Sequence, residues 1–236
     1  MKTILFCLPY GGGSATIYHS WKKDVHPSIE LVPLELAGRG RRFLDPFYRD
    51  LDEAVDDIYQ MIIGQVEHYP YSIFGHSMGA LLAFECVHRL RIKNQRMPDV
   101  LFLSGKNPPH RKGDKLRHQL SDEEFRQEIF ALGGTPREVM EQKEMFDFFL
   151  PILRADFRMI ETHETQKSYE KLACKMLVLH GSRDEQAAPS MVEEWSLYTE
   201  KEFQSFPFEG DHFFIHSQKG SVIGLINETL TSTATE

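Results

Sequence analysis

Short apolar runs alternate with amphipathic stretches along most of this chain. The apolar runs predict β-strands, and they lie at Thr3–Leu8, Leu31–Leu36, Tyr71–Phe74, Val100–Ser104, Met176–His180 and Phe203–Phe206. Helical patterns, such as the one over Asp50–Gly64, lie between most of these runs. Strands that alternate with helices predict an α/β fold, with a mainly parallel sheet covered by helices on both faces.

One strand pattern runs directly into a helical pattern through a glycine-flanked serine. After Tyr71–Phe74 come Gly75-His76-Ser77-Met78-Gly79, and the helical run follows at once. This is the Gly-x-Ser-x-Gly nucleophile elbow in its required context of strand, tight turn and helix. The alternative is a glycine-rich turn with an incidental serine. The context favours Ser77 as a nucleophile at a helix N-terminus, where free amides and the helix dipole stabilise developing negative charge.

The longest stretch without a strand pattern, about residues 106–171, predicts a helical lid. Ser121-Asp-Glu-Glu124 is a capping box, Gly133-Gly134 predicts the end of that helix, and Thr135-Pro136 predicts the start of another. The following run, which contains Phe148 and Phe149, is too apolar for a surface helix. These aromatic residues either line an apolar pocket for an acyl chain or form the lid's own small core.

The parts that would complete a catalytic serine site follow in the expected order of acid and then histidine. Asp184 comes just after the strand predicted at Met176–His180, and His212 follows a glycine turn. We expect Asp184 to orient His212, and His212 to act as the general base. The competing residues are Glu185 and Asp156 for the acid, and His216 and His76 for the base.

The first predicted strand ends in Pro9-Tyr10-Gly11-Gly12-Gly13-Ser14. In hydrolases with a nucleophile elbow, a loop after an early strand supplies the second amide of the oxyanion hole. We therefore expect the amides of Gly11 and Met78 to form that hole. A plain turn is the alternative; a phosphate-binding loop is disfavoured, because neither the Walker ending nor the G-x-G-x-x-G spacing is present.

Two basic segments have no evident partner in the sequence. Arg39, between Gly38 and Gly40, either meets an anionic group or forms salt bridges with neighbours in a solvated turn. The segment from Lys106 to His118 holds five lysines and arginines against one acidic residue, and Arg111, Lys112 and Lys115 belong to it. This second segment is either a docking surface for an acidic partner or a solvated loop.

Composition narrows the class of protein further. At 236 residues with 41% hydrophobic content, the chain is expected to form one domain over residues 1–236. Its net charge of −8 argues against nucleic acid as a partner, and no apolar run approaches the ~20 residues that span a bilayer.

Features of the N-terminal run and of the cysteines predict a cytoplasmic location. The first eight residues read as a strand rather than as a signal peptide, and the three cysteines lie in apolar runs, as reduced core residues do. C-x-x-C and H-E-x-x-H patterns are absent, so neither a metal nor another cofactor is expected.

Taken together, the motifs resemble type II thioesterases, the editing enzymes of non-ribosomal peptide and polyketide synthesis, which have the α/β-hydrolase fold. The segments that carry the resemblance are Leu8–Ala15, Leu36–Arg42, Phe74–Ala80, Leu103–Gly105, Leu150–Asp156, Gly181–Asp184 and Gly210–Phe214. The chain departs from the family pattern at Gly11, Ala37 and Asp211, where alanine, proline and glycine are more usual. Asp211 would place a second carboxylate beside His212.

The resemblance implies a Ser77–Asp184–His212 triad that hydrolyses acyl or aminoacyl thioesters. The leaving thiol would be phosphopantetheine on a peptidyl or acyl carrier protein, so the substrate and not the enzyme carries that group. We expect a monomer that needs no membrane. The alternatives are an esterase or acyltransferase with the same triad, and a hydrolase-fold binding protein with an idle triad.

Overall fold

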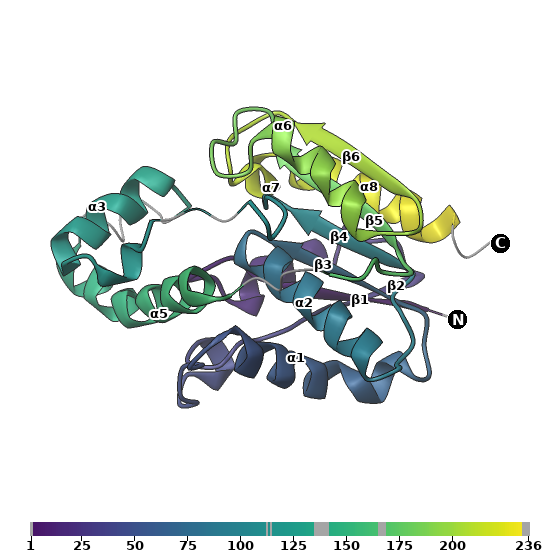
Figure 1. Ribbon diagram of the computed structural model, residues 1–236, viewed down its shortest axis with the longest axis horizontal. Helices are drawn as coiled ribbons and strands as arrows, with labels where there is room; N and C mark the ends of the chain where they lie inside the picture. The colour runs from purple at the N-terminus through teal and green to yellow at the C-terminus, as the bar shows by residue number, and fades with distance from the viewer. Residues whose placement is uncertain (1, 112, 114, 135–141, 165–168, 233–236) are drawn as a thin grey trace.

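The computed structural model describes residues 2–111, 113, 115–134, 142–164 and 169–232. Six strands form one sheet in the order β2-β1-β3-β4-β5-β6, and every neighbouring pair is parallel (Figure 1). The strands are β1 (Thr3–Leu8), β2 (Ile29–Pro33), β3 (Tyr71–His76), β4 (Val100–Ser104), β5 (Lys175–Gly181) and β6 (Phe203–Phe208). The predicted α/β fold with its parallel sheet is confirmed.

Helices cover both faces of this sheet. Those of the body are α1 (Leu51–Val66), α2 (Met78–Ile92), α6 (Pro189–Val192), α7 (Phe214–Ser217) and α8 (Lys219–Ser232). Short 3-10 helices complete the body at η1 (Ala15–Trp21), η2 (Gly40–Arg42) and η4 (Glu193–Tyr198).

Strand β1 contributes side chains to a separate core on each face of the sheet. Ile4 and Phe6 join the cluster that includes α1 and α2, whereas Leu5 and Cys7 join the one with η1, α7 and α8. Successive side chains of a strand point to opposite faces, so a strand that is buried on both sides reads as one continuous apolar run.

The apolar pattern located the strands well, with one shift. β2 begins at Ile29 and ends at Pro33, although the pattern predicted Leu31–Leu36. Leu34 and Leu36 lie beyond the strand but are buried in the cluster with α1 and α2. Apolar residues indicate burial and not a particular secondary structure. The loop after β2 is also buried, so its apolar residues were included in the predicted strand.

The predicted lid is a helical unit built from η3 (Arg117–Gln119), α3 (Asp122–Leu132) and α5 (Lys143–Thr162). These helices project beyond one end of the sheet (Figure 1). Helix α3 begins at the predicted capping box of Ser121 and Glu124, and it ends at Gly133. Phe125, Ile129 and Phe146 form part of a core within the lid. The helix start predicted at Thr135-Pro136 lies outside the described residues.

The three cysteines are free and buried, as predicted. Burial raises the thiol pKa to about 12 for Cys86 and for Cys174, so both stay protonated and unreactive at neutral pH. Within the described ranges, none of the helices combines the length and the apolar character that a membrane span requires.

Candidate active site

Two neighbouring strands send the chain to opposite faces of the sheet, and the site lies where they part. β1 and β3 are paired; η1 follows β1 and packs on one face, while α2 follows β3 and packs on the other. Such a divergence leaves a crevice at the carboxyl ends of the strands. Gly11 lies just after β1 and Ser77 just after β3, so both border this crevice.

The turn that presents Ser77 is strained and tightly packed. Ser77 has φ of 54° and ψ of −112°, which is unusual for a residue with a side chain. A Cβ on Gly75 would lie 2.1 Å from the carbonyl oxygen of Gly79, and one on Gly79 would lie 2.2 Å from that of Leu8. Only glycine fits at these two positions, which explains the Gly-x-Ser-x-Gly spacing.

Three side chains from distant parts of the chain form a hydrogen-bonded relay. His212 Nε2 lies 2.9 Å from Ser77 Oγ, and His212 Nδ1 lies 2.9 Å from Asp184 Oδ2. The backbone amides of Gln186 and Ala187 donate to Asp184 Oδ1 at 2.8 and 2.9 Å. This is the geometry in which a carboxylate orients an imidazole that faces a hydroxyl.

The charge state of Asp184 results from opposing effects. Burial alone would raise the pKa of this carboxyl, but the bonds from His212 and from two backbone amides outweigh it and lower the pKa below its usual value. Asp184 therefore remains a carboxylate at neutral pH and can stabilise a protonated His212.

The described hydrogen bonds of the His212 ring involve neither of the competing acidic residues. Asp156 forms an ion pair with Arg39, and Glu185 is exposed at the edge of the cavity. The Asp211 carboxylate accepts a hydrogen bond from the Phe213 amide at 2.9 Å and is exposed. Although Asp211 precedes His212 in the chain, the described hydrogen bonds of the His212 ring go to Asp184 and Ser77 and not to Asp211.

The competing histidines also have other neighbours. His216 Nε2 lies 3.1 Å from the Tyr10 hydroxyl, and His76 Nδ1 lies 2.9 Å from Ser104 Oγ. His76 is fully buried beneath His212, with ring centroids 5.2 Å apart. Burial holds the pKa of His76 well below its ordinary value, so this ring is neutral.

In the loop formed by Gly11, Gly12 and Gly13, which we call the glycine loop, one of the three backbone amides has no acceptor in the described part of the chain. The Gly12 amide donates to Asp156 Oδ2 at 2.7 Å, and the Gly13 amide donates to the Tyr10 carbonyl at 2.9 Å. Among the residues that the structure describes, no acceptor is present for the Gly11 amide. Gly11 borders the cavity together with Met78, the first residue of α2, so both amides can serve an oxygen near Ser77.

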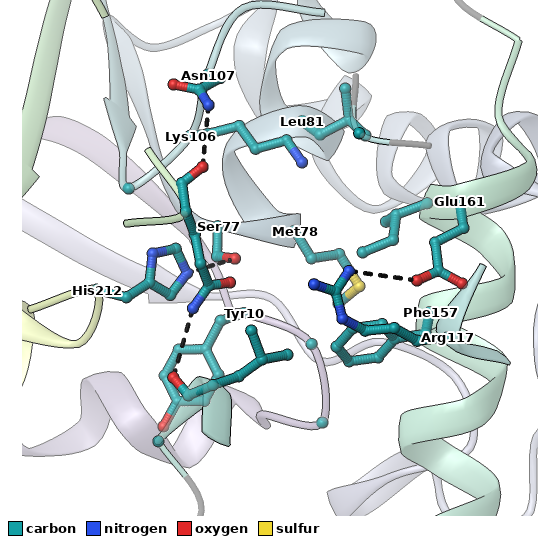
Figure 2. A pocket seen from close by; sticks show the side chains of 18 of the residues that line it. Tyr10, Ser77, Met78, Leu81, Lys106, Asn107, Arg117, Phe157, Glu161 and His212 are labelled. Atoms are coloured by element: carbon teal, nitrogen blue, oxygen red, sulfur yellow. Dashed lines mark hydrogen bonds and ion pairs between the residues drawn. The ribbon is translucent and has the colours of Figure 1, made fainter. Parts of the chain in front are cut away.

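A cavity of about 730 Å³ opens between the body and the lid beside Ser77 and His212. Figure 2 shows Ser77 and His212 on one side of it, with Met78 and Leu81 from α2 and Phe157 from the lid facing the same space. The other apolar lining residues are Ile17, Ile129, Leu132, Phe149, Leu153, Ile160, Met191 and Phe213. The wall is predominantly apolar, as an acyl-binding site requires.

The two candidate phenylalanines have different positions. Phe149 borders the cavity, whereas Phe148 is 55% exposed and stacks on Phe43 with ring centroids 5.6 Å apart. Phe149 is thus placed to contact an acyl group in this cavity, whereas Phe148 does not line it. Helical spacing could have separated the two residues, because Phe149, Leu153, Phe157 and Ile160 form one stripe along α5.

The basic segment is paired with acidic side chains. Arg111 Nε and a terminal nitrogen donate to Glu194 at 2.7 and 2.6 Å, and Lys115 Nζ lies 2.6 Å from Glu128. Both cations line the cavity, but each has a carboxylate partner. Lys112 lies outside the described residues. In the folded chain, acidic neighbours thus offset part of the positive charge that the sequence of this segment indicates.

No cluster of three or more potential metal ligands occurs within the described part of the chain. The described site brings together the Ser77–His212–Asp184 hydrogen bonds, the amides of Gly11 and Met78, and an apolar cavity. A family model described as "Thioesterase domain" matches residues 3–230. The chain belongs to this thioesterase family, and its enzymes are hydrolases that act on thioesters.

Individual relatives and solved structures are similar to this chain over nearly its whole length. The chain is 35% identical to "Linear gramicidin dehydrogenase LgrE" of Brevibacillus parabrevis, over 98% of this thioesterase and 89% of that protein. It is 37% identical to ClbQ from the colibactin NRPS/PKS pathway, with a TM-score of 0.93 and coverage of 98% of both chains. The type II thioesterase BorB from the borrelidin cluster is 32% identical, with a TM-score of 0.87, 97% of this chain covered and 92% of BorB.

Proposed function

We propose that this thioesterase removes acyl or aminoacyl groups from the phosphopantetheine arm of carrier proteins through Ser77, His212 and Asp184. The observation that carries the proposal is the 2.9 Å contact of Ser77 Oγ with His212 Nε2 at the wall of an apolar cavity. Support for a carrier as the source of the acyl group comes from relatives such as ClbQ, whose pathway is of the NRPS/PKS type.

Acylation begins when His212 accepts the Ser77 proton and Oγ attacks the thioester carbonyl carbon. The carbonyl oxygen gains negative charge, which the amides of Gly11 and Met78 stabilise. The carbon–sulfur bond then breaks, and the sulfur leaves as a thiol after it receives the proton from His212. Asp184 holds the imidazole in the required tautomer and stabilises its cationic form throughout.

Deacylation repeats these steps with water as the nucleophile. His212 accepts a proton from the water, the oxygen attacks the acyl carbon of the Ser77 ester, and the same two amides stabilise the second oxyanion. Collapse of this intermediate releases the carboxylic acid, and His212 returns its proton to Ser77. The reaction consumes one water per thioester.

The cavity of about 730 Å³ is large enough for short and medium acyl groups together with part of the pantetheine arm. We propose acetyl and other short, misprimed acyl groups as the cargo. We also propose a cytoplasmic location, because three buried free thiols suit a reducing compartment.

A panel of acyl groups tests the proposal. Groups of increasing length are loaded on peptidyl carrier proteins, acyl carrier proteins and coenzyme A, and thiol release is followed with Ser77→Ala as the blank. We expect release from carriers with a higher kcat/KM than from coenzyme A. Matched oxygen esters are included, and hydrolysis of the esters without thiol release would instead support an esterase.

The dehydrogenase name of LgrE is not transferred to this chain. With Gly11 and Gly13 as the first two glycines of a G-x-G-x-x-G motif, the third would fall at Thr16. A threonine there departs from the fingerprint of dinucleotide-binding loops.

A further inference from the structure

Two motifs that the proposed mechanism does not use meet in a buried ion pair. Arg39, in the turn before η2, bonds to Asp156 on lid helix α5 through two hydrogen bonds of 2.6 Å each. The side chains are 3% and 2% exposed, so solvent screens the pair very little. Its bidentate geometry holds both partners in fixed orientations.

Both members of this pair also bond to the glycine loop. Asp156 Oδ2 accepts a hydrogen bond from the Gly12 amide at 2.7 Å, and Arg39 donates to the Gly13 carbonyl at 3.3 Å. Helix α5 packs closely on the loop here, since a Cβ on Gly12 would lie 2.5 Å from Leu153 Cδ2. The pair thus binds the Gly11–Gly12 peptide group through its N–H and the Gly13–Ser14 peptide group through its carbonyl.

A third buried side chain binds Ser14 and Ala15, the two residues that follow the glycine loop. Glu35, which is 3% exposed, accepts hydrogen bonds from the Ala15 amide at 3.0 Å and from Ser14 Oγ at 3.2 Å. Every residue from Gly12 to Ala15 therefore has a polar contact to a buried charged side chain. Of the three glycine amides, that of Gly11 is the one with no acceptor among the described residues.

We propose that Arg39 and Asp156 are positioning residues that hold the glycine loop so that the Gly11 amide faces the reacting carbonyl oxygen. They touch neither Ser77 nor His212 in any contact that the structure describes. Since Asp156 lies on α5, the lid contributes to the oxyanion hole through this carboxylate. The inference deepens the proposed function and rests on it, because it assigns a role within the same reaction.

The energetic consequence follows from how oxyanion holes act. A backbone amide stabilises the tetrahedral oxyanion only if it already points at the position where the charge develops. If the loop rotates away, ground-state binding in the apolar cavity is largely preserved, but transition-state stabilisation is lost. Loss of one oxyanion donor lowers kcat by about 10²- to 10³-fold in serine hydrolases.

The test compares a ligand that forms an oxyanion with one that cannot. A trifluoromethyl ketone analogue of the acyl thioester adds to Ser77, whereas the matching thioether analogue only occupies the cavity. For Asp156→Asn we expect kcat to fall about 10²-fold with KM within about threefold. The ketone should lose affinity by a similar factor, and the thioether should bind as before.

A second variant removes the ion pair while the protein is expected to stay folded. Arg39→Met combined with Asp156→Leu replaces the ion pair with apolar side chains, a change that often leaves stability intact or raises it. Fluorophosphonate labelling of Ser77 counts the folded sites in each preparation. A stable double variant with wild-type kcat and ketone affinity would overturn the proposal.

A matched lid variant separates positioning from general loosening of α5. Asp122→Asn removes the ion pair of Asp122 with Arg154, which also joins α5 to its surroundings but does not contact the glycine loop. We expect wild-type kcat and ketone affinity for this control; the same loss as in Asp156→Asn would also overturn the proposal. Absence of thioester hydrolysis by the wild-type enzyme would contradict the proposed function instead.

Discussion

His212 Nε2 lies 2.9 Å from Ser77 Oγ, although 135 positions separate the two residues in the chain. Ser77 follows β3 and His212 follows β6, so two further strands lie between them in the sheet. Gly105, after β4, makes the approach possible: a Cβ there would lie 2.6 Å from the His76 ring and 3.3 Å from the His212 ring. The contact therefore depends on a small residue from an intervening strand.

Ser77→Ala should abolish turnover while the protein stays folded. The substitution removes one hydroxyl, leaves no large cavity, and eliminates the nucleophile. Thiol release from an acyl thioester and fluorophosphonate labelling should both fall to background, with circular dichroism unchanged. Substantial turnover in this variant would contradict the covalent mechanism.

Asp184→Asn should lower kcat by about 10⁴-fold, because an amide favours the wrong tautomer of His212. The matched control is Asp211→Asn, since the exposed Asp211 carboxylate bonds to the Phe213 amide and not to the imidazole. We expect near wild-type kcat for the control. Equal losses in both variants would show that Asp211 acts on His212 after all.

Phe149→Ala should shift acyl preference toward longer chains, because the side chain borders the cavity. An added methylene is worth about 1–3 kcal/mol in an apolar pocket, so the shift should be roughly tens-fold at most. Phe148→Ala is the control on the same helix, since Phe148 stacks on Phe43 outside the cavity. Measured kcat/KM values across acyl lengths should change for Phe149→Ala alone.

Exchange of Arg111 and Glu194 distinguishes docking from local structure. Hydrogen bonds from Arg111 and His110 lower the pKa of Glu194 to about 2, so the pair is ionised at any assay pH. Arg111→Glu alone should reduce kcat/KM on carrier-bound and small thioesters, because it places two carboxylates together where the lid begins.

The double change Arg111→Glu with Glu194→Arg should restore activity on both kinds of substrate. A double variant that recovers only the small thioester would indicate that a carrier contacts Arg111 directly. The comparison is best repeated at two salt concentrations, since direct docking between charges weakens with salt.

Because of the buried His88, the free energy of unfolding should be lower at mildly acidic pH than at neutral pH. Burial, assisted by Arg91, lowers the pKa of His88 to about 4, although Glu85 and Glu170 act in the opposite direction. The unfolded chain binds a proton near pH 6.5, and the folded protein does not until about pH 4. The free energy of unfolding therefore falls as pH decreases through this interval.

One pKa unit corresponds to 1.36 kcal/mol, so His88 can lower the free energy of unfolding by roughly 3 kcal/mol at most. Urea unfolding of the wild type and of His88→Leu at pH 7.5 and 4.5 measures this change, and the variant should lose less stability than the wild type. His19→Gln is the control, because His19 is exposed. An identical pH dependence in wild type and His88→Leu would contradict the assignment.

Local patterns in the sequence were sufficient for the elements and for the nucleophile. Strands β1 and β4 have the predicted bounds, and α3 begins at its predicted capping box. Both signals, the apolar pattern of a strand and the capping of a helix end, involve residues that are close in the chain. The elbow at Ser77 is also recognisable locally, since Gly75 is required by a clash with Gly79 within the turn. The requirement for Gly79 comes instead from Leu8 on the neighbouring strand.

The partners of the other charged residues were decided only by the tertiary structure. The position of Asp184 just after a predicted strand indicated its role beside His212, but nothing in the sequence indicated that Asp156 pairs with Arg39, 117 positions away. The pairing of Arg111 with Glu194 was also invisible in the sequence. An ion pair forms wherever strand order and helix packing bring two charges within reach, and no local preference of either residue records that distance.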